Sequence, residues 1–124
     1  MCKALFRGKG NRKYNDGSWY EGYLIKDSDG DYQIFFNGCI RVTVLEDTIG
    51  RYTGKTIKNI RLYQDDVCKS RKGLFRVIWN EKKAAFMMEF YETSEMLYLD
   101  AMQDDAEIIG NIHDTPEYWR ETEQ

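Results

Sequence analysis

DTIGRYTGKTIKNIRLYQDDVCK, from Asp47 to Lys69, is the stretch that decides the fold. It holds two short apolar clusters, at residues 49–52 and 62–63, joined by a polar, basic connection. A strand-like run then begins at Val67. Short apolar runs bounded by polar turn residues are typical of β-strands. The stretch therefore predicts a β-rich fold, and it contains no motif that specifies a reaction.

Length and composition place the chain among ordinary globular proteins. It has 124 residues, of which 42% are hydrophobic, 31% are charged and 15% are aromatic. This length fits one domain or two small subdomains with a shared core. No apolar run approaches the roughly 18 residues of a membrane span, and no hydrophobic segment follows the basic residues near the N-terminus. We expect a protein with no membrane partner, located in the cytoplasm.

Upstream of the central stretch, the sequence predicts an antiparallel meander. Its strands are expected over Ser18–Lys26, Asp31–Phe36 and Cys39–Leu45, the last with the clearest alternation of apolar and polar residues. The Asp-Ser-Asp-Gly-Asp segment 27–31 is a turn, because its glycine does not match the EF-hand spacing. Asn37-Gly38 gives a second hairpin turn. A shorter first strand is expected over Lys3–Arg7.

Downstream, further strands and one helix are expected. Gly73–Asn80 and Ala84–Tyr91 read as a hairpin, and Glu107–Ile112 as a returning strand. Residues 93–105 are ambiguous, with a strand favoured over Met96–Leu99 and a helical turn possible after it. Thr115, followed by Pro116 and Glu117, predicts the start of a short C-terminal helix that runs to about Arg120.

Charge is distributed unevenly along the chain. Residues 51–83 carry ten basic and three acidic groups, whereas residues 84–124 carry one basic and eleven acidic groups. These segments either pair with one another, within a monomer or between subunits, or present a basic face to nucleic acid. Pairing is favoured because the chain as a whole is acidic, with a formal net charge of −3.

Five segments in register resemble one protein family. They are Phe6-Arg7-Gly8-Lys9, Gly17-Ser18-Trp19 with Gly22-Tyr23-Leu24-Ile25, Thr48-Ile49-Gly50-Arg51-Tyr52-Thr53-Gly54, Leu62-Tyr63 with Asp66-Val67, and Ile108-Ile109-Gly110-Asn111-Ile112-His113-Asp114 with Pro116-Glu117. Their order and spacing resemble the YopX family, which is encoded by bacteriophages and prophages. The chain departs from the family pattern where Ile60 follows Asn59 in place of a glycine. It departs again at Gln64-Asp65-Asp66, where the family has Glu-Gly-Asp.

The resemblance implies a mostly β fold with an SH3-like small barrel in the C-terminal part, and it brings no catalytic residues. Together with the strand pattern, it predicts an all-β protein: an N-terminal meander over residues 1–48, packed with an SH3-like barrel region and a short C-terminal helix over residues 49–124. The two parts could also form one compact domain. The expected location becomes the cytoplasm of a bacterial host cell.

Several residues could carry chemistry, but each has a simpler interpretation. Adjacent Asp65 and Asp66 could share a metal only in a turn, with Glu81 or Glu107 as further ligands. His113 has no serine or cysteine partner in a recognisable motif. The three cysteines Cys2, Cys39 and Cys68 show no metal-ligand spacing. We expect no catalytic residues, no metal and no cofactor.

Two functions remain as hypotheses. The first is a non-enzymatic protein-interaction or self-assembling β-module, with a homo-oligomer held by the opposed charges. The alternative is a single-stranded nucleic-acid-binding module, in which aromatic residues of the C-terminal part stack bases. Its candidate contacts are the basic residues of the 51–76 stretch: Arg51, Lys55, Lys58, Arg61, Lys69, Arg71, Lys72 and Arg76.

Overall fold

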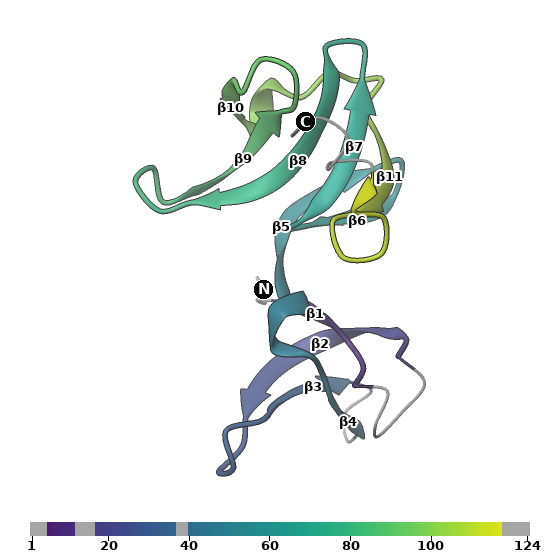
Figure 1. Ribbon diagram of the computed structural model, residues 1–124, viewed down its shortest axis with the longest axis vertical. Coiled ribbons are helices and arrows are strands. Elements are labelled where there is room, and N and C mark those ends of the chain that lie inside the picture. The colour runs from purple at the N-terminus through teal and green to yellow at the C-terminus, as the bar shows by residue number, and fades with distance from the viewer. Residues whose placement is uncertain (1–4, 12–16, 37–39, 118–124) are drawn as a thin grey trace. The chain divides into compact units, whose positions relative to one another are not determined.

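The computed structural model describes residues 5–11, 17–36 and 40–117, and every extended element in them is an antiparallel β-strand (Figure 1). This confirms the all-β prediction. The chain forms two compact units, Met1–Tyr52 and Thr53–Gln124, and the boundary falls inside strand β5. The strands are β1 Phe6–Lys9, β2 Trp19–Lys26, β3 Tyr32–Phe36, β4 Ile40–Thr43, β5 Gly50–Ile57, β6 Ile60–Tyr63, β7 Asp66–Ser70, β8 Gly73–Asn80, β9 Ala85–Phe90, β10 Met96–Tyr98 and β11 Glu107–Asn111.

The first unit is the predicted meander. Its strand order is β4-β3-β2-β1, and β1 also pairs with the start of β5. Asp27 organises the β2–β3 turn, because its carboxylate accepts the backbone N–H groups of Asp29 and Asp31 at 2.9 and 3.0 Å. The turn therefore has the hairpin role expected from sequence. The Asn37-Gly38 turn lies outside the described residues, as do the first two residues of the expected Lys3–Arg7 strand. The last two residues of that strand, Phe6 and Arg7, lie in β1.

One end of the meander closes on itself. Gly10 forms an antiparallel bridge with Val44, and the backbone of Leu45 donates to the carbonyl of Lys9 at 2.9 Å. Thr48, in the 3₁₀ turn η1 (Glu46–Thr48), is buried and accepts the N–H of Lys9 through its hydroxyl at 2.9 Å. These bonds join the end of β4 to β1, so the backbone at this end is paired although the strands are short.

The second unit contains a five-stranded sheet in the order β10-β9-β8-β7-β11, preceded by the β5–β6 hairpin. Its core is apolar and includes four side chains with 1% exposure or less from four different strands: Leu62, Cys68, Phe75 and Met88. The returning strand predicted over Glu107–Ile112 is present as β11, and it pairs with β7. In the described pairings β11 pairs with β7 and β10 pairs with β9, so β10 and β11 are the two open edges of the sheet. A closed SH3-like barrel is therefore not shown and stays a prediction.

The ambiguous segment 93–105 is resolved into two short elements. Met96–Tyr98 forms β10, and Leu99–Ala101 forms the 3₁₀ turn η2. The second half of the predicted C-terminal helix, residues 118–120, lies outside the described residues. Where the helix was expected to start, the Thr115 hydroxyl bonds both the N–H and the carbonyl of Asn111, at 3.1 and 2.9 Å. Thr115 therefore fastens a turn. Glu117, the last residue that the structure describes here, has helical backbone, but one residue does not establish a helix, which stays a prediction.

The departures from the family pattern keep the backbone shape that glycine usually provides. Lys58 and Asn59, between β5 and β6, have φ of 52° and 68°, and Asp65 has φ of 75°. Two consecutive residues with positive φ are typical of the tight type I′ hairpin. The turn is thus retained without glycine, and each of these non-glycine residues bears the steric cost of a left-handed conformation.

We expect Ala84→Gly to stabilise the protein by about 0.5–1 kcal/mol, because Ala84 adopts φ of 51° in the β8–β9 turn and gains nothing from its methyl group there. Urea unfolding measures the effect. The matched control is Ala85→Gly, which makes the same change one residue later, inside β9, and should destabilise by a similar amount. The expectation would be contradicted if Ala84→Gly and Ala85→Gly changed the free energy of unfolding in the same direction.

Candidate functional site

Asp65 and Asp66, the adjacent carboxylates considered for a metal, have different environments. Asp66 is only 2% exposed, and its carboxylate accepts the N–H of Tyr63 at 2.8 Å, so it fixes the β6–β7 turn. Asp65 bonds the ring of His113, with Oδ2 and Nε2 3.2 Å apart. Of the two further candidates, Glu107 pairs with lysines. The described part of the chain contains no cluster of three potential metal ligands.

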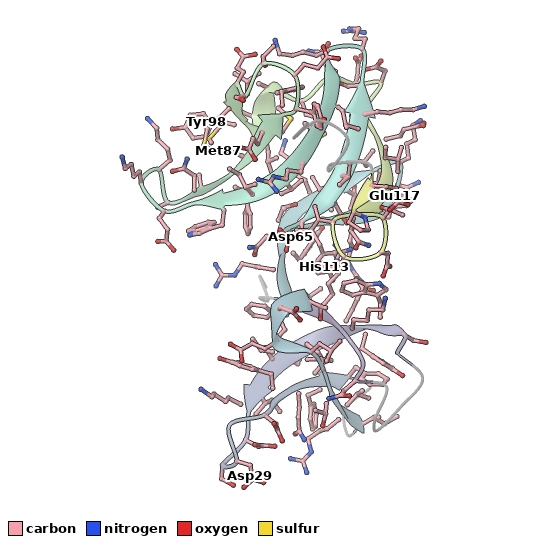
Figure 2. The ribbon with its side chains drawn as sticks, in the orientation of Figure 1. Asp29, Asp65, Met87, Tyr98, His113 and Glu117 are labelled. Carbon is pink, nitrogen blue, oxygen red and sulfur yellow. The ribbon has the colours of Figure 1, made fainter. Side chains whose placement is uncertain are left out.

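The Asp65–His113 contact joins the β6–β7 turn to the loop after β11 (Figure 2). Backbone bonds hold both ends: the N–H of Ile112 donates to the carbonyl of Asp65 at 3.0 Å, and Asn111 Oδ1 accepts the N–H of His113 at 2.9 Å. Both side chains are about four-fifths buried. The sequence did not indicate this pair, because 47 residues separate its members. These hydrogen bonds hold the two turns together, so the Asp65–His113 pair has a structural role.

The basic stretch is paired with the acidic end of the chain, inside the second unit. Lys58 and Lys69 contact Glu107 at 3.1 and 3.6 Å, and the Lys58 hydrogen bond and charge, with the charge of Lys69, lower the pKa of this carboxyl. Three further pairs follow the same pattern: Arg71–Asp104 at 3.6 Å, Lys72–Glu95 at 3.2 Å and Arg76–Glu89 at 2.7 Å. The opposed charges thus meet within one chain.

This pairing bears on both functional hypotheses. Of the eight candidate nucleic-acid contacts, five carry a carboxylate partner, and a sixth, Arg51, lies 5.6 Å over the ring of Phe6. Lys55 and Arg61 are exposed. Because nearby carboxylates cancel the field that attracts phosphate, the electrostatic argument for nucleic-acid binding is reduced. The argument for a homo-oligomer held by the same charges is reduced equally. Both stay predictions.

Cys68 lies in the core, in β7. Burial, and then the charge of Asp66, raise the pKa of its thiol far above the usual range. Since the thiolate is the reactive form, this cysteine is a packing residue and not a nucleophile.

We therefore expect Cys68 to resist alkylation by iodoacetamide in the folded protein and to react rapidly in urea. Mass spectrometry of the peptide that contains Cys68 measures this directly and separates it from Cys2 and Cys39. The native rate should be lower by about 100-fold or more. Alkylation of folded and unfolded protein at similar rates would show that the β7 core opens readily.

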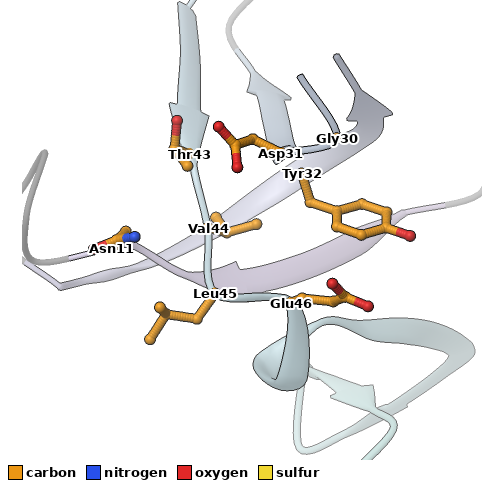
Figure 3. Close-up of a pocket in the computed structure, with 8 residues that line it drawn as sticks. All are labelled: Asn11, Gly30, Asp31, Tyr32, Thr43, Val44, Leu45 and Glu46. Carbon is orange, nitrogen blue, oxygen red and sulfur yellow. The ribbon is translucent and has the colours of Figure 1, made fainter. Parts of the chain in front are cut away.

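A cavity of about 290 Å³ opens on the first unit (Figure 3). The residues that line it come from the segment after β1, from the β2–β3 turn with the start of β3, and from the end of β4 with the segment that leads into η1: Asn11, Gly30, Asp31, Tyr32, Thr43, Val44, Leu45 and Glu46. The carboxylates of Asp31 and Glu46 are exposed to solvent. No feature of the described residues specifies a ligand for this cavity, and we assign it no function.

Exposed apolar side chains gather at the β10 edge of the second sheet. Met96 is 42% exposed and Tyr98 is 47% exposed. Cross-strand pairing places Tyr98 opposite Met87, and Figure 2 shows the two side chains next to each other. Met87 is 4% exposed although it lies outside the main core cluster. We call the exposed side chains of Met96 and Tyr98 the β10 surface, and the sequence did not identify it because residues 93–105 were ambiguous.

Fold and surface together define a small, all-β protein of two units, in which the most distinctive candidate site is an exposed apolar strand edge. Within the described residues, no helix is long and apolar enough to cross a membrane. A family model described as YopX protein matches residues 6–119, nearly the whole chain. The chain therefore belongs to the YopX protein family. No curated protein matches the sequence.

Proposed function

We propose that this YopX-family chain is a non-enzymatic protein-interaction module, of phage or prophage origin, that acts through its second unit. The observation that carries the proposal is the β10 surface. Tyrosine and methionine are enriched in the cores of protein interfaces, and methionine adapts its shape to a partner. Met96 and Tyr98 are each more than 40% exposed, and they lie two residues apart on one face of the same strand, so together they form an apolar contact point for a partner.

The charge pattern supports the same proposal. The ion pairs of the second unit lie around the sheet and involve residues from β7, β8 and β9. Because these charges are largely satisfied within the chain, they contribute little long-range attraction to a polyanion. An apolar contact with a partner protein does not need such attraction, so the β10 surface remains the stronger basis for binding.

The direct test compares the wild-type chain with the double variant Met96→Ser/Tyr98→Ser. Each protein is immobilised and exposed to a bacterial lysate, and each captured protein is purified and titrated against both chains by calorimetry. We expect a partner whose affinity falls by about tenfold or more in the double variant, as for central apolar interface residues. The proposal fails if every captured protein binds both chains equally, or if nothing binds.

Nucleic-acid binding is tested separately. We expect labelled single-stranded oligonucleotides to show no anisotropy change with this chain at low salt, where phosphate contacts are strongest. Binding at low salt that weakens steeply as salt rises, and that is lost in Lys55→Ala/Arg61→Ala, would instead favour the nucleic-acid module. These two residues are exposed on the β5–β6 hairpin, away from the β10 surface in sequence.

A further inference from the structure

β10 has an edge whose backbone groups point away from the sheet. In an antiparallel pair, opposite residues alternate between hydrogen-bonded and non-hydrogen-bonded pairs. The N–H of Phe90 donates to the carbonyl of Glu95 at 2.8 Å, and the register places Leu97 opposite Met88. Leu97 is therefore the residue that bonds β9. The N–H and C=O groups of its two neighbours in β10 face the opposite way.

These two neighbours are Met96 and Tyr98, the same residues whose side chains are exposed. No backbone partner for them outside β9 occurs in the described residues. One short strand thus offers unpaired main-chain donors and acceptors together with two apolar side chains. This combination is what a protein needs to accept an additional strand from a partner.

The charges around β10 select the kind of partner. Residues 91–105 contain five acidic residues and no basic one: Glu92, Glu95, Asp100, Asp104 and Asp105. Lys72 pairs with Glu95, the Arg71 side chain contacts Asp104, and the Arg71 backbone N–H donates to Asp105. This leaves Glu92 and Asp100, which are exposed on either side of the strand. Two copies of this edge would repel each other. The chain's own residues 117–124, with three acidic groups and one basic group, have the wrong charge as well.

We propose that β10 accepts an extended segment of a partner protein as an added strand, and that this segment has alternating apolar residues flanked by lysine or arginine. Main-chain bonds to Met96 and Tyr98 hold the segment, apolar side chains contact the β10 surface, and its basic flanks meet Glu92 and Asp100. This inference rests on the proposed protein-interaction function and adds to it the mode of binding and the chemistry of the partner.

The backbone geometry of Tyr98 permits a sharp test. Tyr98 has φ of −66°, the value that a proline ring imposes, and its N–H faces outward. Tyr98→Pro therefore removes one outward donor without removing a bond to β9, as is tolerated on edge strands. The matched control is Tyr98→Ala, which removes the same side chain but keeps the N–H. Equal melting temperatures and β-sheet circular dichroism of the two variants establish that both are folded.

A library of random short peptides is selected on the full wild-type chain, and the enriched peptides are titrated by fluorescence anisotropy. We expect them to contain alternating apolar residues with basic flanks. Tyr98→Pro should weaken their binding by about tenfold more than Tyr98→Ala does, since an outward donor is lost and the ring obstructs the edge. The double variant Glu92→Gln/Asp100→Asn should weaken binding by about threefold and reduce its salt dependence.

Several outcomes would overturn the inference. If Tyr98→Pro and Tyr98→Ala bind the peptides equally, main-chain pairing is not used, and a partner lost on Met96→Ser/Tyr98→Ser would still support a protein-interaction module. If no peptide is enriched, or if the enriched peptides are acidic, strand addition by a basic segment is wrong. A dimer in light scattering that Tyr98→Pro dissociates would identify a second copy of this chain as the occupant instead.

Discussion

Replacing Gly22 with alanine is expected to lower the free energy of unfolding of the first unit by about 3 kcal/mol or more. A Cβ at this position would lie 2.2 Å from the carbonyl oxygen of Phe35 and 3.2 Å from the side chain of Ile34. The first contact is with backbone, so no side-chain rotation relieves it. Overpacking usually costs about 1–3 kcal/mol, and a clash with main chain lies at or above the upper end.

The reason for the close approach is the path of β2. Gly22 is the last residue of β2 that pairs with β1, and the pairing with β3 begins at Tyr23. The strand therefore changes partners at this point, and its backbone passes against β3 where a side chain would stand. Glycine in a strand commonly marks such a close approach between backbones.

The matched control for this prediction is Gly30→Ala. Gly30 has φ of +89° in the β2–β3 turn, and a Cβ there would meet no atom within 4 Å. Only conformational strain is introduced, at a cost of about 1 kcal/mol. Hydrogen exchange of the β2 and β3 amides, followed by NMR, compares the variants within the first unit. The steric explanation of Gly22 would be contradicted if Gly22→Ala and Gly30→Ala lowered the stability of the first unit by similar amounts.

Asp66→Ala is expected to destabilise the second unit by about 3 kcal/mol. The carboxylate is 2% exposed and accepts the N–H of Tyr63 at 2.8 Å, and Tyr63 is itself buried. Removing the carboxylate leaves the buried N–H of Tyr63 without this hydrogen bond, which costs about 1–3 kcal/mol. Because the acceptor is charged, we expect a cost near the upper end of this range. The empty space left by the side chain adds a packing loss.

Asp65→Asn provides the comparison for Asp66→Ala, since it alters the neighbouring carboxylate of the same turn. Asparagine tolerates the φ of 75° at this position and keeps an oxygen that can face His113. We expect a loss below about 1 kcal/mol, because asparagine keeps the hydrogen-bonding contact with the His113 ring. Chemical denaturation followed by far-ultraviolet circular dichroism measures both variants. A larger loss for Asp65→Asn would mean that the Asp65–His113 contact, and not Asp66, fixes the turn.

The sequence predicted most strands because alternation and turn residues are local signals. The β2–β3 and β8–β9 hairpins follow from Asp27–Asp31 and from the apolar runs around residues 81–84. The sequence did not decide the secondary structure of residues 93–105, because apolar residues at positions 96, 97 and 99 fit both a strand and a helical spacing. The distinction depends on what the segment packs against, and β9 supplies a partner for only three residues.

The candidate site was less predictable than the fold. The basic and acidic segments were visible in the sequence, and so was their possible pairing, but not which charges meet: Glu107 binds both Lys58 and Lys69 across the β7–β11 pair and the β5–β6 hairpin. The exposure of Met96 and Tyr98 was also not predictable. Apolar side chains in a strand are normally expected to be buried, and only their position in a sheet shows whether a neighbouring strand covers them.

By itself, the sequence determined the family, the β-class, the meander and the uneven distribution of charge, because each of these is encoded in short-range patterns. Tertiary structure alone decided that the charges cancel within the second unit, that Gly22 stands where β2 changes partners, and that β10 ends the sheet. The physical reason is common to all three. Ion pairing, close approach and strand edges depend on residues far apart in the chain, and their meeting is fixed only when the strands are paired.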